Sequence, residues 1–408
     1  MRERLRRSVV ARAWRAAAAA GALALAACAP TARPRPAAGP PAAVAGLTDA
    51  GLVPWLDSVR QHHGVPAMAA IVVRADTVLA RGAAGVRRAG DAVPVTIADR
   101  FQLGSNTKAL TAVLLARLVE AGTLGWTSTP ADVFPELRDS ISAGFRGATL
   151  ERLLSHHAGV SPYTDTDDPD FRALPRLSGP PPARRRAFAA HVLRGAPVGS
   201  PRPDGVYPGL YSNGDYVIAA AMAERATGES WEALMEERVF RPLGLRGTFA
   251  WSDAPDLDQP WGHHETRGGV RAVDPRDRGE RVPPILWPAG AVELSIDDYG
   301  RYLQLHLRGL AGRDTPLLRA TTIARLHASP AGDRFALGWG VQEFVGAPAS
   351  AHVGSAGAFY AVTVLLPTRD LAVAVFANAG GDRAATAARD ALRALARRHS
   401  AGTAPGGP

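Results

Sequence analysis

The chain has 408 residues, 46% of them hydrophobic and 21% charged, so it carries enough apolar side chains to build a core. Its 42 glycines and 33 prolines follow no G-X-Y period, which excludes a collagen-like or low-complexity protein. The formal net charge is +9, but residues 1–27 alone hold six arginines against one glutamate. The remaining residues are nearly balanced in charge, a pattern that does not favour nucleic-acid binding.

The N-terminus has the pattern of an export signal. A basic start runs into an apolar stretch, Ala17–Ala27, that is far shorter than the roughly 20 residues needed to span a bilayer. The stretch ends in Leu25-Ala26-Ala27-Cys28, which resembles a bacterial lipobox, where the cysteine is lipidated and becomes the new N-terminus. Cys28 is the only cysteine, which excludes an internal disulfide. We therefore expect an exported protein of the cell envelope, anchored in a membrane by a lipid on Cys28.

The composition divides the chain into four segments. Residues 1–27 are expected to form the lipoprotein signal peptide, and residues 28–46, rich in alanine and proline, an extended tether that cannot bury a core. Residues 47–398 are expected to form one folded domain, followed by a disordered tail over 399–408.

The folded domain begins and ends with strand patterns. Near its start, a helical pattern over 49–62 precedes two antiparallel strands, at 69–73 and 77–80. Near its end, apolar runs at 361–366 and 371–377 flank Pro367-Thr368-Arg369-Asp370, a strong hairpin signal, and a helix is expected over 382–397. Strands at both ends around a helical middle predict an α+β fold, with one antiparallel sheet formed from both chain ends, flanked by helices, and an inserted, mostly helical region.

The middle of the domain contains a proline-rich segment, 165–208, that we expect to form long loops. It includes Arg184-Arg185-Arg186, the densest basic run after the N-terminus. No aromatic residues are interleaved with these arginines, so we expect a solvated loop or a helix start rather than a phosphate-binding patch.

Lys108 is the only lysine among the 47 basic Lys and Arg residues. A preference for arginine can reflect the base composition of the gene, but that explanation does not account for the exception. Arginine cannot be deprotonated in a protein, whereas burial lowers the pKa of a lysine and lets it act as a base. The single lysine therefore predicts a role that needs a removable proton.

Lys108 lies three residues after Ser105, at the start of a segment whose helical spacing ends at Gly122. Positions i and i+3 share one face of a helix, which places the Ser105 hydroxyl within reach of the amine. A helix N-terminus also favours the negative charge that develops on an attacking oxygen. A serine N-cap followed by a surface lysine is the common alternative for this spacing, so the pair alone is not diagnostic.

Two later motifs complete a pattern. Tyr211-Ser212-Asn213 precedes a helical run over 217–227, and His352-Val353-Gly354-Ser355 precedes the terminal hairpin, where a strand edge could form one wall of a cleft. The order Ser-x-x-Lys, Tyr-x-Asn, His-x-Gly resembles the serine β-lactamase and penicillin-binding-protein superfamily. It is most similar to the branch that contains class C β-lactamases, D-alanyl-D-alanine carboxypeptidases and esterases. Segments 153–160 and 237–245 also match segments typical of that family.

The resemblance implies a β-lactamase/transpeptidase-like fold and a serine hydrolase that forms an acyl-enzyme without metal or cofactor. Ser105 would be the nucleophile and Lys108 its proton acceptor. Tyr211 would carry the proton to the leaving group. Which of Lys108 and Tyr211 is the resting base stays open at this point.

The resemblance also assigns substrate-binding residues. Asn213 would orient the lysine and bind the substrate amide, and the backbone N–H groups of Ser105 and Ser355 would form the oxyanion hole. In the third motif, His352 would donate a hydrogen bond toward the tyrosine, and Gly354 completes the family pattern. Val353 departs from the Lys-Thr-Gly form of β-lactamases because it removes a hydroxyl that would meet a substrate carboxylate. This change disfavours β-lactam hydrolysis and favours an ester or an uncharged amide, unless the hydroxyl of Ser355 takes the place of the missing one.

The expected substrate is therefore a small molecule or a peptide-like compound, an amide, β-lactam or carboxylic ester. Two other interpretations stay open: a penicillin-binding or sensing module that acylates without efficient turnover, and a catalytically silent scaffold. The retained reactive residues argue against the scaffold. Three histidine pairs occur, at 62–63, 156–157 and 263–264, but none has the spacing of a zinc motif, and we expect no metal.

Overall fold

The computed structural model describes residues 49–164, 169–175, 177–250 and 257–400. The expected signal peptide, Cys28 and the expected tether over 28–46 lie outside these residues. Within the described ranges, none of the helices is long and apolar enough to cross a membrane.

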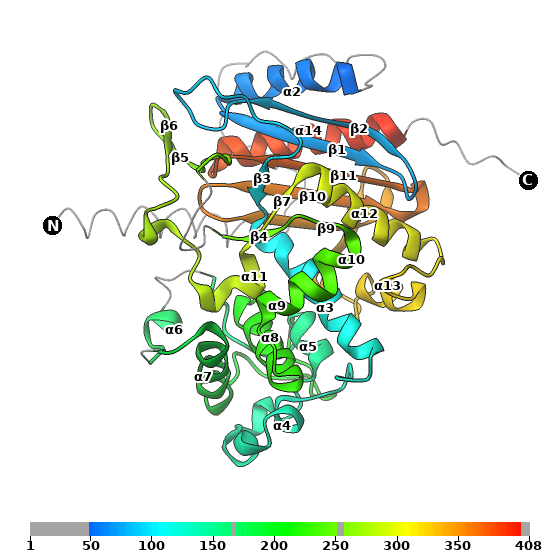
Figure 1. Ribbon diagram of the computed structural model, residues 1–408. Coiled ribbons are helices and arrows are strands. Elements are labelled where there is room, and N and C mark those ends of the chain that lie inside the picture. The colour runs from blue at the N-terminus through cyan, green and yellow to red at the C-terminus, as the bar shows by residue number, and fades with distance from the viewer. Residues whose placement is uncertain (1–48, 165–168, 176, 251–256, 401–408) are drawn as a thin grey trace, which may run out of the picture.

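Both ends of the domain build one six-stranded antiparallel sheet (Figure 1). Its order is β2-β1-β11-β10-β9-β8, so the N-terminal hairpin joins the C-terminal strands through β1 and β11. The strands are β1 (Ala67–Val73), β2 (Val78–Gly85), β8 (Gly340–Phe344), β9 (Ala347–Ser355), β10 (Tyr360–Leu366) and β11 (Leu371–Ala377). This arrangement confirms the predicted α+β fold and the origin of the sheet in both chain ends.

Helices cover both faces of this sheet, which explains why β1 and β11 are buried along their whole length. Alternate residues of β1 face opposite sides. Met68 and Val72 pack in the core under α2 (Asp49–His63) and α14 (Asp382–Ser400), whereas Ile71 packs in the larger core on the other face, beside α12 (Ile296–Leu310). Helix α14 runs to Ser400, so residues 399–400 of the expected tail are helical; residues 401–408 lie outside the described ranges.

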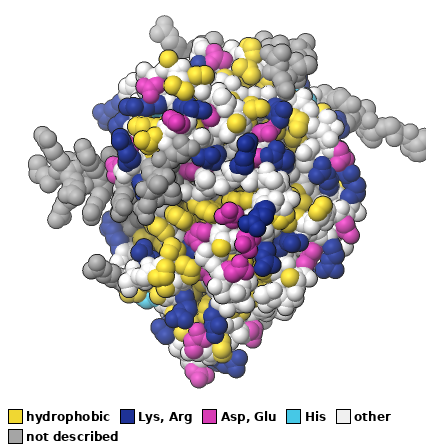
Figure 2. Space-filling view, in the orientation of Figure 1, with side chains coloured by type: hydrophobic (Ala, Val, Ile, Leu, Met, Phe, Trp, Pro, Cys, Tyr) yellow, Lys and Arg dark blue, Asp and Glu magenta, His cyan; other side chains and the backbone are white. Residues whose placement is uncertain are grey.

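The chain between β2 and β8 forms the helical region below the sheet in Figure 1. On the face shown in Figure 2, basic and acidic side chains are interspersed, and hydrophobic side chains gather between the sheet and the helical region. A small sheet (β3, β7, β4) and a hairpin (β5, β6) accompany the helices. The elements are β3 (Arg100–Gln102), α3 (Thr107–Glu120), α4 (Pro130–Val133), α5 (Leu150–Leu154), α6 (Pro169–Arg172), α7 (Pro181–Arg194), α8 (Asn213–Thr227), α9 (Trp231–Met235), α10 (Arg241–Leu243), β4 (Thr248–Phe249), β5 (His263–Thr266), β6 (Gly269–Ala272), α11 (Trp287–Gly290), β7 (Val292–Ser295), α12 and α13 (Ala320–Leu326).

Helix α7 corrects the expectation of long loops over 165–208. Pro181 and Pro182 occupy the first positions of the helix, where proline is favoured because the missing N–H has no helical partner and φ is already suitable. The buried residues Arg185, Phe188 and Val192 then follow helical spacing. The prolines therefore start a helix here.

The arginine run lies at the start of α7, which was one of the two alternatives expected, but Arg185 is not solvated. Its side chain is 0% exposed and donates hydrogen bonds to Glu224 at 2.6 Å, to Glu232 at 2.8 Å and to the Pro284 carbonyl at 3.0 Å. Arg186, the next residue of the same helix, is exposed. One arginine of the run thus joins α7 to α8 and α9 as the centre of a buried ion cluster.

We predict that Arg185→Met lowers the free energy of unfolding by about 3–5 kcal/mol, because it leaves the Glu224 carboxylate buried without its cation. Urea denaturation measures this loss. The matched control, Arg186→Met, should change the free energy by less than about 0.5 kcal/mol. Equal losses in the two variants would contradict a central role for the buried ion cluster.

Candidate active site

Ser105 and Lys108 lie together where a short turn leads into α3. Residues Gly104–Asn106 form a 3-10 turn and α3 begins at Thr107, so Ser105 lies in the turn rather than in the helix. The Nζ atom of Lys108 is 3.1 Å from the Oγ atom of Ser105. Ser105 is partly exposed, whereas Lys108 is fully buried. The structure therefore places an accessible hydroxyl against a buried amine.

Two carbonyl oxygens hold the Lys108 amine in place. Its Nζ donates to Asn213 Oδ1 at 2.6 Å, at the start of α8, and to the Ala289 carbonyl at 2.9 Å, in α11. Burial lowers the pKa of Lys108 well below its usual value. A neutral amine has two hydrogens and one lone pair. With both hydrogens on carbonyl oxygens, the lone pair is directed to the hydroxyl of Ser105.

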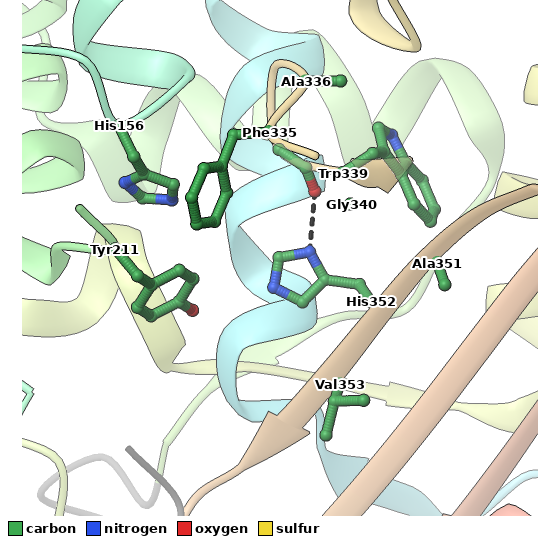
Figure 3. Close-up of a pocket in the computed structure, with 10 residues that line it drawn as sticks. His156, Tyr211, Phe335, Ala336, Trp339, Gly340, Ala351, His352 and Val353 are labelled. Carbon is green, nitrogen blue, oxygen red and sulfur yellow. Dashed lines mark hydrogen bonds between the residues drawn. The ribbon is translucent and has the colours of Figure 1, made fainter. Parts of the chain in front are cut away.

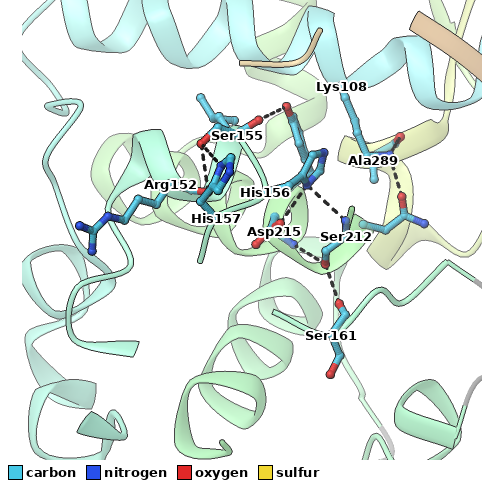
Figure 4. A network of polar contacts seen from close by, with 12 residues as sticks. Lys108, Arg152, Ser155, His156, His157, Ser161, Ser212, Asp215 and Ala289 are labelled. Atoms are coloured by element: carbon cyan, nitrogen blue, oxygen red, sulfur yellow. Dashed lines mark hydrogen bonds and ion pairs between the residues drawn. The ribbon is translucent and has the colours of Figure 1, made fainter. Parts of the chain in front are cut away.

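Asp215 lies close to this amine but bonds to His156 (Figure 4). The backbone N–H of Ser212 donates to His156 Nδ1 at 3.2 Å, which makes this nitrogen an acceptor. The Oδ2 atom of Asp215 is 2.9 Å from the same nitrogen, and a protonated carboxyl can donate there. Burial raises the pKa of Asp215 well above its usual value, in agreement with this assignment. Asp215 is therefore a neutral acid.

Tyr211 lies between the amine and His156. The Lys108 Nζ is 4.7 Å from the centre of the Tyr211 ring, and the imidazole centre of His156 is 4.6 Å from it. The phenol also shares a hydrogen bond with the Ser105 side chain. Burial raises the pKa of Tyr211, so the phenol keeps its proton at neutral pH.

The end of β9 closes the site on the opposite side of Ser105. A Cβ on Gly354 would lie 1.9 Å from the Leu103 carbonyl oxygen, and a Cβ on Gly104 would lie 2.6 Å from the Ser355 nitrogen. Only glycine at both positions allows the strand and the turn to approach so closely. The pairing of β8 with β9 ends at Ala351, so residues 352–355 form an open strand edge beside the hydroxyl.

His352 is oriented differently from the expectation. Its Nδ1 donates to the Gly338 carbonyl at 2.7 Å (Figure 3). Burial and the nearby Lys108 lower the pKa of His352 to about 3, so the ring is neutral. The other ring nitrogen, on the side that faces Tyr211 in Figure 3, then carries a lone pair. The expectation that His352 donates toward Tyr211 was wrong, because its one N–H is used by Gly338.

A pocket lies beside Tyr211 (Figure 3). Its walls are apolar or small residues together with Tyr211 and two histidines. The lining residues are His156, Tyr211, Phe335, Ala336, Gly338, Trp339, Gly340, Ala351, His352 and Val353. Within the described ranges, no group of three or more His, Cys, Asp or Glu side chains could hold a metal ion.

Sequence reasoning missed several contributors to the site. Asn106 donates to the carbonyls of Leu103 and Ala361, both at 3.3 Å, and so fixes the turn that carries Ser105 against β10. The rarity of asparagine in this chain was a signal for Asn106. Asp215 lies two residues after Asn213. Its burial at the start of α8 is seen only in the structure, so the sequence contains no specific signal for it. The Ala289 carbonyl left no side-chain signal at all.

Comparison with known proteins gives consistent matches. The family model described as Beta-lactamase matches residues 45–398. Penicillin-binding protein 4 of Amycolatopsis lactamdurans is 29% identical over 338 residues, covering 79% of this chain and 84% of that protein. Esterase EstB of Burkholderia gladioli is 28% identical over 284 residues, covering 63% of this chain and 71% of that protein. The crystal structure of SurE superposes with a TM-score of 0.65 at 25% identity, covering 86% of this chain and 75% of that one.

Proposed function

The chain belongs to the β-lactamase family, and from this premise we propose that it hydrolyses an amide or ester substrate through an acyl-enzyme on Ser105. One observation carries the proposal: the buried Lys108 amine lies 3.1 Å from the Ser105 hydroxyl with both donor positions taken by carbonyl oxygens. A hydroxyl is a weak nucleophile until a base removes its proton, and this geometry supplies the base.

In the proposed acylation, Lys108 is the resting base. Its Nζ accepts the Ser105 proton while Oγ forms a bond to the substrate carbonyl carbon. Tyr211 cannot start the reaction in this way, because its raised pKa keeps the phenol protonated at neutral pH. As the tetrahedral intermediate collapses, the phenol gives its proton to the leaving nitrogen or oxygen and recovers one from the lysine ammonium.

The negative charge of the intermediate needs donors beside Ser105. The backbone N–H groups of Ser105 and Ser355 are the proposed oxyanion hole, because Gly104 and Gly354 bring these two backbone segments together. Such a donor contributes on the order of 3 kcal/mol to the transition state. Asn213 holds the amine with Oδ1 and donates from Nδ2 to the Tyr163 carbonyl at 3.0 Å, leaving its second amide hydrogen for a substrate carbonyl. Hydrolysis of the acyl-enzyme by water then regenerates the hydroxyl.

We predict that Ser105→Ala abolishes hydrolysis of p-nitrophenyl acetate. Lys108→Arg should lower kcat/KM by roughly a thousandfold, because a guanidinium cannot accept the serine proton. Near-UV circular dichroism checks that both variants keep the native fold. Wild-type activity in Lys108→Arg would refute the assigned base.

Intact mass after incubation with benzylpenicillin distinguishes an enzyme from a sensing module. A Ser105-dependent adduct that decays with the turnover rate supports a hydrolase. A stable adduct, together with no turnover of any ester, would favour a protein that acylates without deacylation.

We further propose that the protein is exported and held in the cell envelope by a lipid on Cys28. The basic start, the short apolar stretch and the single cysteine support this proposal. Mass spectrometry of the N-terminal peptide from the membrane fraction should find a diacylglycerol-modified Cys28. Recovery of an unmodified N-terminus that retains residues 1–27 would contradict it.

A further inference from the structure

The pocket beside Tyr211 is placed to receive the leaving group, an assignment that rests on the proposed function. Its lining includes Tyr211 and His352, but neither Ser105 nor Ser355. The phenol delivers the proton to the departing atom in the proposed reaction. The pocket adjoins this phenol, so it is the space we assign to the group attached to that atom.

The walls of this pocket carry no positive charge. Phe335, Trp339 and Val353 supply apolar surface, and the only ionisable groups besides the phenol are the imidazoles of His156 and His352. Burial lowers the pKa of both imidazoles, so both are neutral at neutral pH. The His352 nitrogen that faces Tyr211 carries a lone pair and no hydrogen, so it cannot donate a hydrogen bond to a carboxylate.

Two charged residues, Asp333 and Arg334, precede the wall residue Phe335, and neither lines the pocket. Asp333 is held by His157 Nε2 at 2.9 Å and by the Phe335 N–H at 2.9 Å, and these contacts lower its pKa, so it is a fixed negative charge beside the pocket wall. The neighbouring Arg334 is exposed, and its guanidinium packs 5.0 Å from the centre of the Phe335 ring.

His156 supplies the pocket with a neutral donor instead. Because its Nδ1 accepts from Ser212 and from Asp215, its proton lies on Nε2, on the side of the ring toward Phe335 and Tyr211 in Figure 3. A neutral N–H among apolar walls matches a carbonyl oxygen rather than a carboxylate. Burying an unpaired carboxylate costs several kcal/mol more than burying an uncharged amide or ester.

We propose that the leaving-group pocket selects substrates whose leaving group is uncharged and carries a carbonyl, such as a capped or interior amide or an ester, and rejects leaving groups with a free carboxylate. The site then acts on blocked or internal acyl bonds rather than by removing a terminal residue that bears a free carboxylate.

The test uses two achiral thioesters of benzoylglycine that differ only in the leaving group, thioglycolic acid or thioglycolamide. Each kcat/KM is divided by the alkaline hydrolysis rate of the same thioester, which removes the intrinsic difference between the leaving groups. The proposal predicts a ratio of about one hundred in favour of the amide, equivalent to roughly 2.7 kcal/mol. Equal normalised rates for the two thioesters, or a faster normalised rate for the free acid, would overturn the proposal.

A pair of variants tests the electrostatic cause. Phe335→Arg places a cation in the pocket wall and should raise the relative rate of the free acid at least about tenfold, whereas the uncharged control Phe335→Leu should leave the preference for the amide. If neither variant folds, the wild-type ratio decides alone. Hydrolysis that depends on Ser105 but favours the free acid would contradict this inference and leave the proposed function intact. If the protein hydrolyses neither thioester and a fluorophosphonate does not label Ser105, the proposed function itself is contradicted.

Discussion

The burial of one lysine amine governs the arrangement of this site. A charged ammonium in a fully buried position needs a carboxylate or several strong acceptors, because desolvation strongly disfavours the charge. Here the Lys108 Nζ donates its two hydrogens to carbonyl oxygens and turns its lone pair to the Ser105 hydroxyl. Asp215, the nearest acid, is occupied with His156. Neutral amine, neutral acid and neutral imidazoles form one consistent arrangement, in which the amine is a base at rest.

The fold explains how segments far apart in the sequence meet at this amine. The turn before α3 carries Ser105, the segment that leads into α8 carries Tyr211, the first residue of α8 is Asn213, and the end of β9 carries Ser355. Helix α11 contributes only a carbonyl, yet Thr111 fixes its position by donating to the Pro288 carbonyl at 2.8 Å. The site lies where the sheet built from both chain ends meets the inserted helical region, so neither half holds it alone.

Much of this arrangement was predictable because the chemistry restricts the residue types. Some signals are local and can be read from the sequence alone. Examples are the lone lysine three residues after a serine and the hairpin with proline and aspartate in its turn. Long-range burial is different. The proline-rich stretch over 181–194 became a helix because its face packs on α8, and Arg185 is buried because two glutamates from other helices meet it. No local pattern records such partners.

The orientation of His352 shows the same limit at the site itself. Its position in the third motif was predictable, and β9 places it beside Tyr211 as the motif implies. The direction of its proton depends on the Gly338 carbonyl, which belongs to a loop fourteen residues earlier and has no side chain. A backbone acceptor of this kind decides whether an imidazole donates or accepts, and the sequence does not reveal it.

The central claim is that Asp215 is a neutral acid and leaves Lys108 a neutral base. The pH dependence of Ser105 labelling by a fluorophosphonate, compared between the wild type and Asp215→Asn, tests it most directly. The asparagine amide can donate to His156 Nδ1 as the acid does. The account therefore predicts that the acid limb, which reports the Lys108 pKa, stays at the same pH in both proteins. A shift of the limb by one unit or more toward lower pH in the variant would show that Asp215 is ionised and stabilises a lysine ammonium, and would contradict the account.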